Sequence, residues 1–355
     1  MPVALNASTA RNCLVVIAVI VAGAAMRWMG DIITPLLLAI FLAVMVDGLA
    51  RQIRRRAPSA PSGVAVLASI LIFGVLLAIA AFIVAGNGSG FVGSLSSHEP
   101  KLNALIARFA IGLGLRAETI DQILGQLDPT PYLTFVAQAL QGLASTAILV
   151  LIYLGFLIAS RHAFERKAVK LFASREERQD AMLVFLRIRD GIERYLWIQT
   201  VLGLVIAVAS WVVMMLIGLD DALFWAFLIF VVNYIPIVGA VVAIAAPALF
   251  ALVQFDGYAR AGILLACLFL ITFVVGNILL PRMQGHSLNM DPLVVLLSLA
   301  FWGALWGLAG MFLSTPLTVL TMVILAQFPG SRWIAVLLSA DGHPEDLGRP
   351  TAEKA

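Results

Sequence analysis

The residues with the clearest chemical potential lie inside apolar sequence, where polar groups are costly. Asn233, Tyr234 and Pro236 interrupt the charge-free stretch 222–255. Asn233 can both donate and accept hydrogen bonds, whereas Pro236 has no amide hydrogen, so carbonyls near it need other partners. These groups predict a neutral polar site near position 236. Asn233 either contacts a solute there or joins two helices, as polar side chains do in membranes.

A second polar pair, Asn277 and Pro281, lies at the end of the next apolar window, 261–280. An asparagine beside a proline again combines a neutral hydrogen-bonding side chain with a disturbed helical backbone. The predicted path of a polar solute therefore comprises Asn233, Tyr234, Pro236, Asn277 and Pro281.

Charged groups are restricted to the ends of these apolar segments. An ionisable residue inside a bilayer is usually functional, but the stretches 222–255 and 292–331 contain none. The candidates for ion coupling are Arg282, His286 and Asp291. Histidine titrates near neutral pH, although a histidine in a loop is more commonly just solvated.

Enzyme and nucleotide motifs are missing from the sequence. It has no H-E-x-x-H metal motif, no G-x-S-x-G nucleophile turn and no G-x-x-x-x-G-K-[ST] phosphate loop. We therefore expect no catalytic residue, metal or cofactor, and no direct use of ATP.

Glycine and proline punctuate both long apolar stretches. In 292–331, Gly303 and Gly307 form a small-xxx-small pattern that lets another backbone approach, and Gly310 with Pro316 is expected to supply a break. In 222–255, Gly239 is expected to adopt a turn geometry denied to other residues. The predicted hinge or close-packing residues are Gly239, Gly303, Gly307, Gly310 and Pro316.

The length of the two stretches requires these interruptions. As continuous helices, 222–255 and 292–331 would measure about 51 and 60 Å, against a hydrocarbon core of about 30 Å. Each must break as a kinked crossing, fold back as a re-entrant hairpin or extend out of the bilayer, and their length favours hairpins. If both are hairpins, they enter the membrane from opposite sides.

Composition places these stretches in an all-α polytopic membrane protein. The chain is 62% hydrophobic and 12% charged, with a mean hydropathy of +1.02. With the two interrupted stretches we expect about eight membrane segments. The other six apolar windows are 13–26, 32–46, 64–85, 139–159, 198–219 and 261–280.

Basic residues beside these windows indicate topology rather than nucleic-acid binding. Arg51, Arg54, Arg55 and Arg56 crowd one short loop, which the positive-inside rule places in the cytoplasm together with both termini. The predicted regions are a three-span unit (1–86), an extracytoplasmic helical cap (87–138), a fourth span (139–160), a cytoplasmic amphipathic segment (161–199), a transport core (200–328) and a cytoplasmic tail (329–355).

The ordered motifs resemble one known family. Asn233 to Pro236 with Gly239, then Gly276-Asn277 with Pro281-Arg282 and Gly285, then Pro292 to Ser298 with Trp302-Gly303, Gly307, Gly310 and Pro316, are similar to the AI-2E family of bacterial transporters, the autoinducer-2 exporters. The resemblance implies a multi-pass inner-membrane protein that is a homo-oligomer, with a pentamer as one expected form. Many relatives carry an acidic residue before the Pro-Arg pair, and here that residue is Leu280.

The leading hypothesis is a secondary transporter that exports a small polar molecule, such as the quorum-sensing signal autoinducer-2. Its expected partners are this solute, the lipid bilayer and further copies of the chain. The alternatives are a monovalent cation/proton antiporter, to which other members of the family are similar, and a channel or oligomeric membrane scaffold.

Overall fold

The computed structural model describes residues 7–59, 61–97, 101, 146–160, 163, 167, 174–284 and 289–343. Within these ranges the regular elements are helices, with one isolated β-bridge between Met290 and Ser339. The predicted all-α fold is therefore confirmed. His286 and most of the predicted cap 87–138 lie outside the described residues.

The chain forms two compact units, each assembled from separate parts of the sequence. The first comprises Met1–Ala43, Leu149–Val184 and Asn289–Glu345, and the second comprises Val44–Ile148, Phe185–Leu288 and Asp346–Ala355. Each unit contains one of the two interrupted stretches, so we describe them separately.

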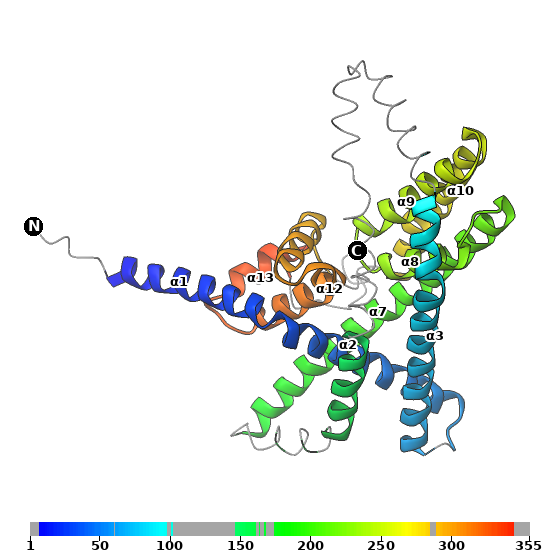
Figure 1. The fold of residues 1–355 in the computed structure, drawn as a ribbon. Coiled ribbons are helices and arrows are strands. Elements are labelled where there is room, and N and C mark those ends of the chain that lie inside the picture. The colour runs from blue at the N-terminus through cyan, green and yellow to red at the C-terminus, as the bar shows by residue number, and fades with distance from the viewer. Residues whose placement is uncertain are drawn as a thin grey trace, which may run out of the picture. The chain divides into compact units, whose positions relative to one another are not determined.

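The first unit contains α1 (Ala7–Trp28), the beginning of α2 (Gly30–Arg56), α12 (Pro292–Ala326) and α13 (Arg332–Leu338) (Figure 1). Helical geometry fails within α12 at Trp306 and Gly307. Trp302 Nε1 donates to Thr318 Oγ1 at 2.9 Å, although these residues are 16 positions apart. A continuous helix would separate them by about 24 Å. The two arms of α12 therefore fold back on each other, and we call this element hairpin 2.

The second unit contains α3 (Ser62–Ser97), α7 (Arg175–Ile217) and α10 (Tyr258–Val274), which a π-helix, η1 (Val275–Leu279), joins to α11 (Leu280–Gln284). Between α7 and α10 lie α8 (Ala222–Val232) and α9 (Val238–Gln254), which pack against each other. We call α8 and α9 hairpin 1. Its arms measure about 17 and 26 Å, so neither reaches across a 30 Å hydrocarbon core.

Large apolar side chains hold hairpin 1 together and against its neighbours. Phe224, Trp225 and Ile229 of α8 are buried, and the Trp225 ring lies 5.5 Å from that of Phe250 of α9. Leu264 and Leu268 of α10 belong to the same core. Within a bilayer such side chains stabilise helix association through van der Waals packing. Hairpin 1 and α10 therefore form one packed body.

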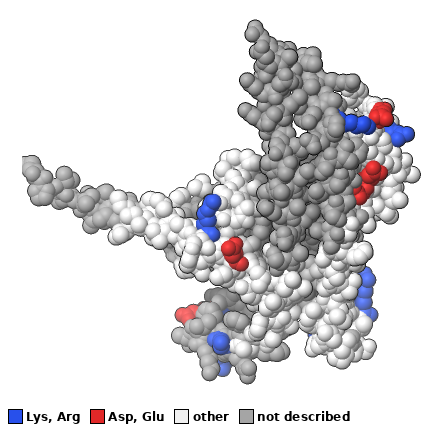
Figure 2. Space-filling view, in the orientation of Figure 1, with Lys and Arg blue, Asp and Glu red and all other residues white. Residues whose placement is uncertain are grey.

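The outward surfaces are apolar where a membrane would lie. Five described helices are long and apolar enough to cross a bilayer: Gly30–Arg56, Ser62–Ile83, Arg175–Ile217, Tyr258–Met283 and Pro292–Ala326. Shorter apolar helices cover Val16–Trp28, Thr146–Ser160 and the two arms of hairpin 1. Figure 2 shows that charged side chains are sparse over the described part of one face. These features confirm a polytopic membrane protein.

Two helices lie partly or wholly outside the apolar windows of the sequence. α3 continues to Ser97, past the predicted start of the cap at residue 87. α13 forms inside the predicted tail and packs on α12. The last turns of α3 are rich in glycine and serine, and α13 has only seven residues. Neither segment is therefore long and apolar enough to appear as an apolar window.

Candidate functional site

The tip of hairpin 1 contains a strained turn. Ile237 has φ 65° and ψ −60°, and the Val238 amide donates to the Pro236 carbonyl at 2.6 Å. This geometry is a γ-turn of the rare, strained form, and it is unfavourable for a β-branched residue. Strained backbone persists only where the surrounding structure requires it, and it is common at functional sites.

Gly239 lies at a close-packing position, one of the two roles that its sequence predicted, and not in the turn itself. We expected Gly239 to supply the turn geometry, but the positive φ is at Ile237, and Gly239 lies in the first turn of α9. A Cβ atom on Gly239 would overlap the Val232 carbonyl oxygen and lie 2.8 Å from its carbon. At Gly239 the second arm of hairpin 1 therefore packs directly on the backbone of the first.

Two neighbouring residues of α7 hold this tip through hydrogen bonds. Gln199 Nε2 donates to the Asn233 carbonyl at 2.9 Å, and Asn233 Nδ2 donates in return to the Gln199 carbonyl at 3.5 Å. The hydroxyls of Thr200 and Tyr234 are 2.6 Å apart. Gly203, one turn further along α7, leaves room for the Asn233 amide, which would lie only 3.0 Å from an added Cβ. These side chains form a polar cluster in an otherwise apolar region.

The cluster keeps hydrogen-bonding capacity for a ligand. Asn233 and Gln199 are both half-buried. Among the described residues, neither the Asn233 Oδ1 nor the Gln199 Oε1 accepts a hydrogen bond. An amide oxygen can accept two hydrogen bonds. The cluster therefore offers neutral acceptors to a solute that carries hydroxyl groups. It also joins two helices, so both sequence interpretations of Asn233 are compatible with its contacts.

Asn277 and Pro281 lie on a separate, irregular helical segment. Asn277 is exposed within η1, and its Nδ2 donates to the Phe273 carbonyl of its own helix at 3.0 Å. Pro281 follows in α11 and cannot donate a backbone hydrogen bond. The Leu280 amide bonds to the Val275 carbonyl, five residues back, which is the π-helical pattern. Such bulges in helices are frequent at functional sites, but no described contact joins Asn277 to the polar cluster.

The three coupling candidates do not form a group in the described structure. Arg282 is exposed in α11. His286 lies outside the described residues. Asp291 is the N-cap of α12, and its carboxylate accepts a hydrogen bond from the Leu293 amide at 2.7 Å. A capping carboxylate stabilises a helix by about 1 kcal/mol, so Asp291 has a sufficient structural role.

Hairpin 2 breaks at a different residue from the one expected. Gly307, with φ 60° and ψ −140°, forms the break together with Trp306, whereas Pro316 is buried inside the second arm. Gly303 and Gly307 therefore do not share one helical face. Gly303 faces the Met311 side chain, and a Cβ on Gly310 would overlap the Trp302 carbonyl oxygen. Gly310 is thus the close-approach residue of hairpin 2.

Two hydrogen bonds join the C-terminal end of α1 to the interrupted part of hairpin 2. Arg27 Nη1 donates to the Ala304 carbonyl at 2.7 Å, and Trp306 Nε1 donates to the Met26 carbonyl at 2.9 Å. A break leaves helical carbonyls without their normal donors, so the arginine replaces a lost backbone hydrogen bond. The sequence interpretation did not include Arg27, since an arginine after an apolar window indicates topology equally well.

The described residues offer no site for a metal, because no three potential ligands from His, Cys, Asp and Glu lie together among them. What they do present is a polytopic membrane protein built around interrupted helices. Secondary transporters place their binding sites at such interruptions, because freed backbone groups are tolerated only beside protein or a water-filled cavity. Comparison with known proteins agrees: the AI-2E family transporter profile matches residues 14–330, and the chain belongs to this family.

Individual relatives cover almost the full chain. It is 31% identical over 321 residues to the AI-2 transport protein TqsA of Escherichia coli K12, covering 88% of this chain and 91% of TqsA. It is 31% identical over 326 residues to E. coli YhhT, covering 89% and 90%. A Haemophilus influenzae protein is 30% identical over 363 residues, covering 96% and 99%. The names of the last two refer to transport without a substrate.

These comparisons confirm the predicted family. The chain is a transport protein rather than an enzyme, and a multi-pass protein of the bacterial inner membrane.

Proposed function

We propose that this protein is a secondary transporter that exports a small neutral polyhydroxylated solute of the autoinducer-2 type. The observation that carries this proposal is the polar cluster of Gln199, Thr200, Asn233 and Tyr234, in which the Gln199 and Asn233 amide oxygens accept no hydrogen bond from the described part of the chain. A neutral acceptor site suits hydroxyl donors and provides no counter-charge for an ion. The similarity to TqsA, which is named for AI-2 transport, supports the same class of solute.

In this proposal, Asn233 and Tyr234 contact the solute, and hairpin 1 changes its position relative to α7 as access alternates. Asn277 and Pro281 extend the solute path through the irregular segment of η1 and α11. Both termini are cytoplasmic, the two hairpins enter the membrane from opposite sides, and the working form is a homo-oligomer.

The test is autoinducer-2 flux in everted membrane vesicles. Replacing Asn233 or Gln199 by leucine removes an acceptor without adding charge, so we expect the solute to bind about 3- to 10-fold more weakly. The matched control is Gln254→Leu. The Gln254 side chain also makes two hydrogen bonds: it accepts from the Asp220 amide and donates to the Gly218 carbonyl. These bonds lie at the end of hairpin 1 that is remote from its tip.

The outcomes separate binding from folding. If Gln254→Leu transports like wild type while Asn233→Leu and Gln199→Leu do not, the polar cluster binds the solute. Equal losses in all three variants would assign both Asn233 and Gln199 to hairpin stability rather than to solute binding. Wild-type vesicles without autoinducer-2 flux would eliminate this solute.

A further inference from the structure

An ion pair joins α2 and α7 within the second unit. Arg51 Nη2 of α2 contacts Glu193 Oε2 of α7, and the two side chains keep only 38% and 26% of their exposure. Partial burial disfavours the ionised form of the Glu193 carboxyl, and the Arg51 guanidinium beside it favours that form. Loss of the carboxylate charge would therefore release the attraction between these helices.

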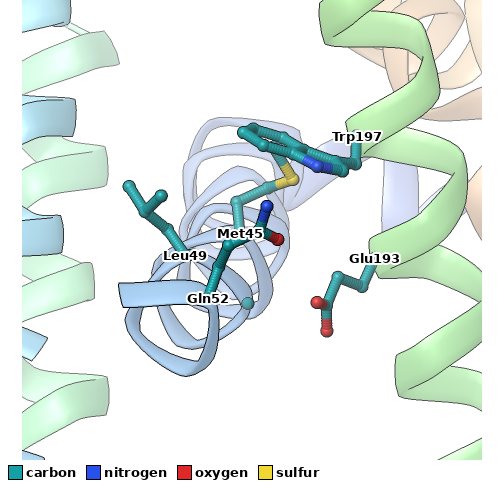
Figure 3. Close-up of a pocket in the computed structure, with 6 residues that line it drawn as sticks. Met45, Leu49, Gln52, Glu193 and Trp197 are labelled. Carbon is teal, nitrogen blue, oxygen red and sulfur yellow. The ribbon is translucent and has the colours of Figure 1, made fainter. Parts of the chain in front are cut away.

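The carboxylate occupies a recess that depends on a glycine. A Cβ atom on Gly48 would lie 2.5 Å from Glu193 Oε1 and 2.7 Å from its carboxyl carbon. Beside this recess is a small cavity between the two helices, which Figure 3 shows with Glu193 on one side. Its lining residues are Met45, Gly48, Leu49, Gln52, Glu193 and Trp197. The carboxylate thus combines burial, a charged partner and adjoining space.

Glu193 is also on the helix that holds the candidate solute site. Gln199 and Thr200 follow it on α7 within two turns, about 10 Å along the axis. α7 therefore contacts α2 through Glu193 and the tip of hairpin 1 through its polar cluster. A continuous helix transmits a shift at one contact to the other.

We propose that Glu193 is the proton-coupling residue of this transporter, an assignment that rests on the transport function proposed above. In the outward-open state the Glu193 carboxylate takes up one proton from the outside and its ion pair with Arg51 breaks. In the inward-open state the neutral acid releases this proton to the cytoplasm, and the carboxylate and the ion pair form again, so that one proton enters for each solute molecule exported. The other charges acting on Glu193 are Arg189 and Asp190 of its own helix. The charge-free hairpins can then remain a purely neutral solute site.

The first experiment measures autoinducer-2 in proteoliposomes with the membrane potential clamped. With one proton exchanged per solute, a gradient of one pH unit drives about tenfold accumulation. Glu193→Gln cannot release a proton, so we expect no gradient-driven accumulation, while solute exchange without a gradient falls by less than about threefold.

A glycine pair provides a matched control. Gly48→Ala places a methyl group against the carboxylate and should impair coupling, whereas Gly74→Ala in α3 meets no atom within 4 Å and should couple normally. If Glu193→Gln retains full gradient-driven accumulation, or loses exchange and accumulation in equal proportion, the ion pair is only a structural clamp and the proposal fails.

A second experiment needs no solute, so its failure is distinct from failure of the proposed function. Trp197 lines the cavity beside Glu193. The fluorescence difference between wild type and Trp197→Phe should change with pH, and this change should vanish in a Glu193→Gln background. A difference signal that is independent of pH, or that titrates equally in Glu193→Gln, would overturn proton binding at Glu193 even if autoinducer-2 is transported.

Discussion

The contact at Gly239 allows a quantitative prediction, because only backbone atoms oppose an added methyl group there. In Gly239→Ala, the new Cβ would overlap the Val232 carbonyl oxygen and lie 3.2 Å from the Asn233 Cα. No side-chain rotation can relieve these contacts, so the arms of hairpin 1 must separate. Overpacking of this kind costs about 1–3 kcal/mol. Alanine's better helix propensity returns at most about 1 kcal/mol.

Thermal unfolding of the purified protein in detergent tests this prediction. Cys267 of α10 is half-buried, so a thiol-reactive dye reports unfolding in a Cys13→Ser background that lacks the exposed cysteine. A net loss of 1–2 kcal/mol should lower the apparent Tm by about 2–6 °C. The hydrogen bonds of Asn233 and Tyr234 to α7 should weaken as well, because both residues lie between the separated arms.

Gly262→Ala is the matched control for this substitution. Gly262 lies in α10, and an added Cβ there meets no atom within 4 Å. It should leave the Tm unchanged or raise it slightly, through helix propensity alone. If Gly239→Ala unfolds at or above the wild-type temperature, the close approach of the arms is not part of the folded protein and the assignment of Gly239 is wrong.

Two further substitutions separate backbone strain from crowding. Ile237→Gly relieves an unfavourable positive φ, so the Tm should rise by about 2–4 °C, and an unchanged or lower Tm would exclude a strained γ-turn. Gly307→Ala has open space around the new methyl group but a φ of 60°, so it should lose about 1–3 kcal/mol of stability through the backbone alone. A fully stable Gly307→Ala would show that Trp306 and Gly307 do not break α12 as described.

The sequence predicted the two hairpins because a physical limit applied to them. Charge-free stretches longer than a bilayer must fold back or kink, and both interruptions lie close to glycine or proline. The residue that takes the strained conformation could not be predicted. Local preference would assign the turn to Gly239, yet tertiary packing requires glycine there and leaves the γ-turn to Ile237.

The residues of α7 that bond to Asn233 and Tyr234 could not be predicted from the sequence either. Gln199 and Thr200 lie 34 positions from Asn233 and Tyr234, and no local pattern connects them. The one available signal was that two polar residues begin the apolar part of α7, where lipid-facing positions would be apolar. Glu193 was similarly obscured, because charges on an amphipathic helix more often face water.

The two hairpins have the same kind of contact between their arms but different turns. In hairpin 1 a strained isoleucine turns the chain, and in hairpin 2 a glycine with positive φ does so. In both, a later glycine, Gly239 or Gly310, lets the second arm pack on a carbonyl of the first, at Val232 or Trp302. Backbone packed on backbone leaves no side chain that can rotate, so we expect each pair of arms to move as one body. The position of Gly239 therefore favours close packing over a hinge, and in the proposed transport cycle we expect hairpin 1 to move about its ends.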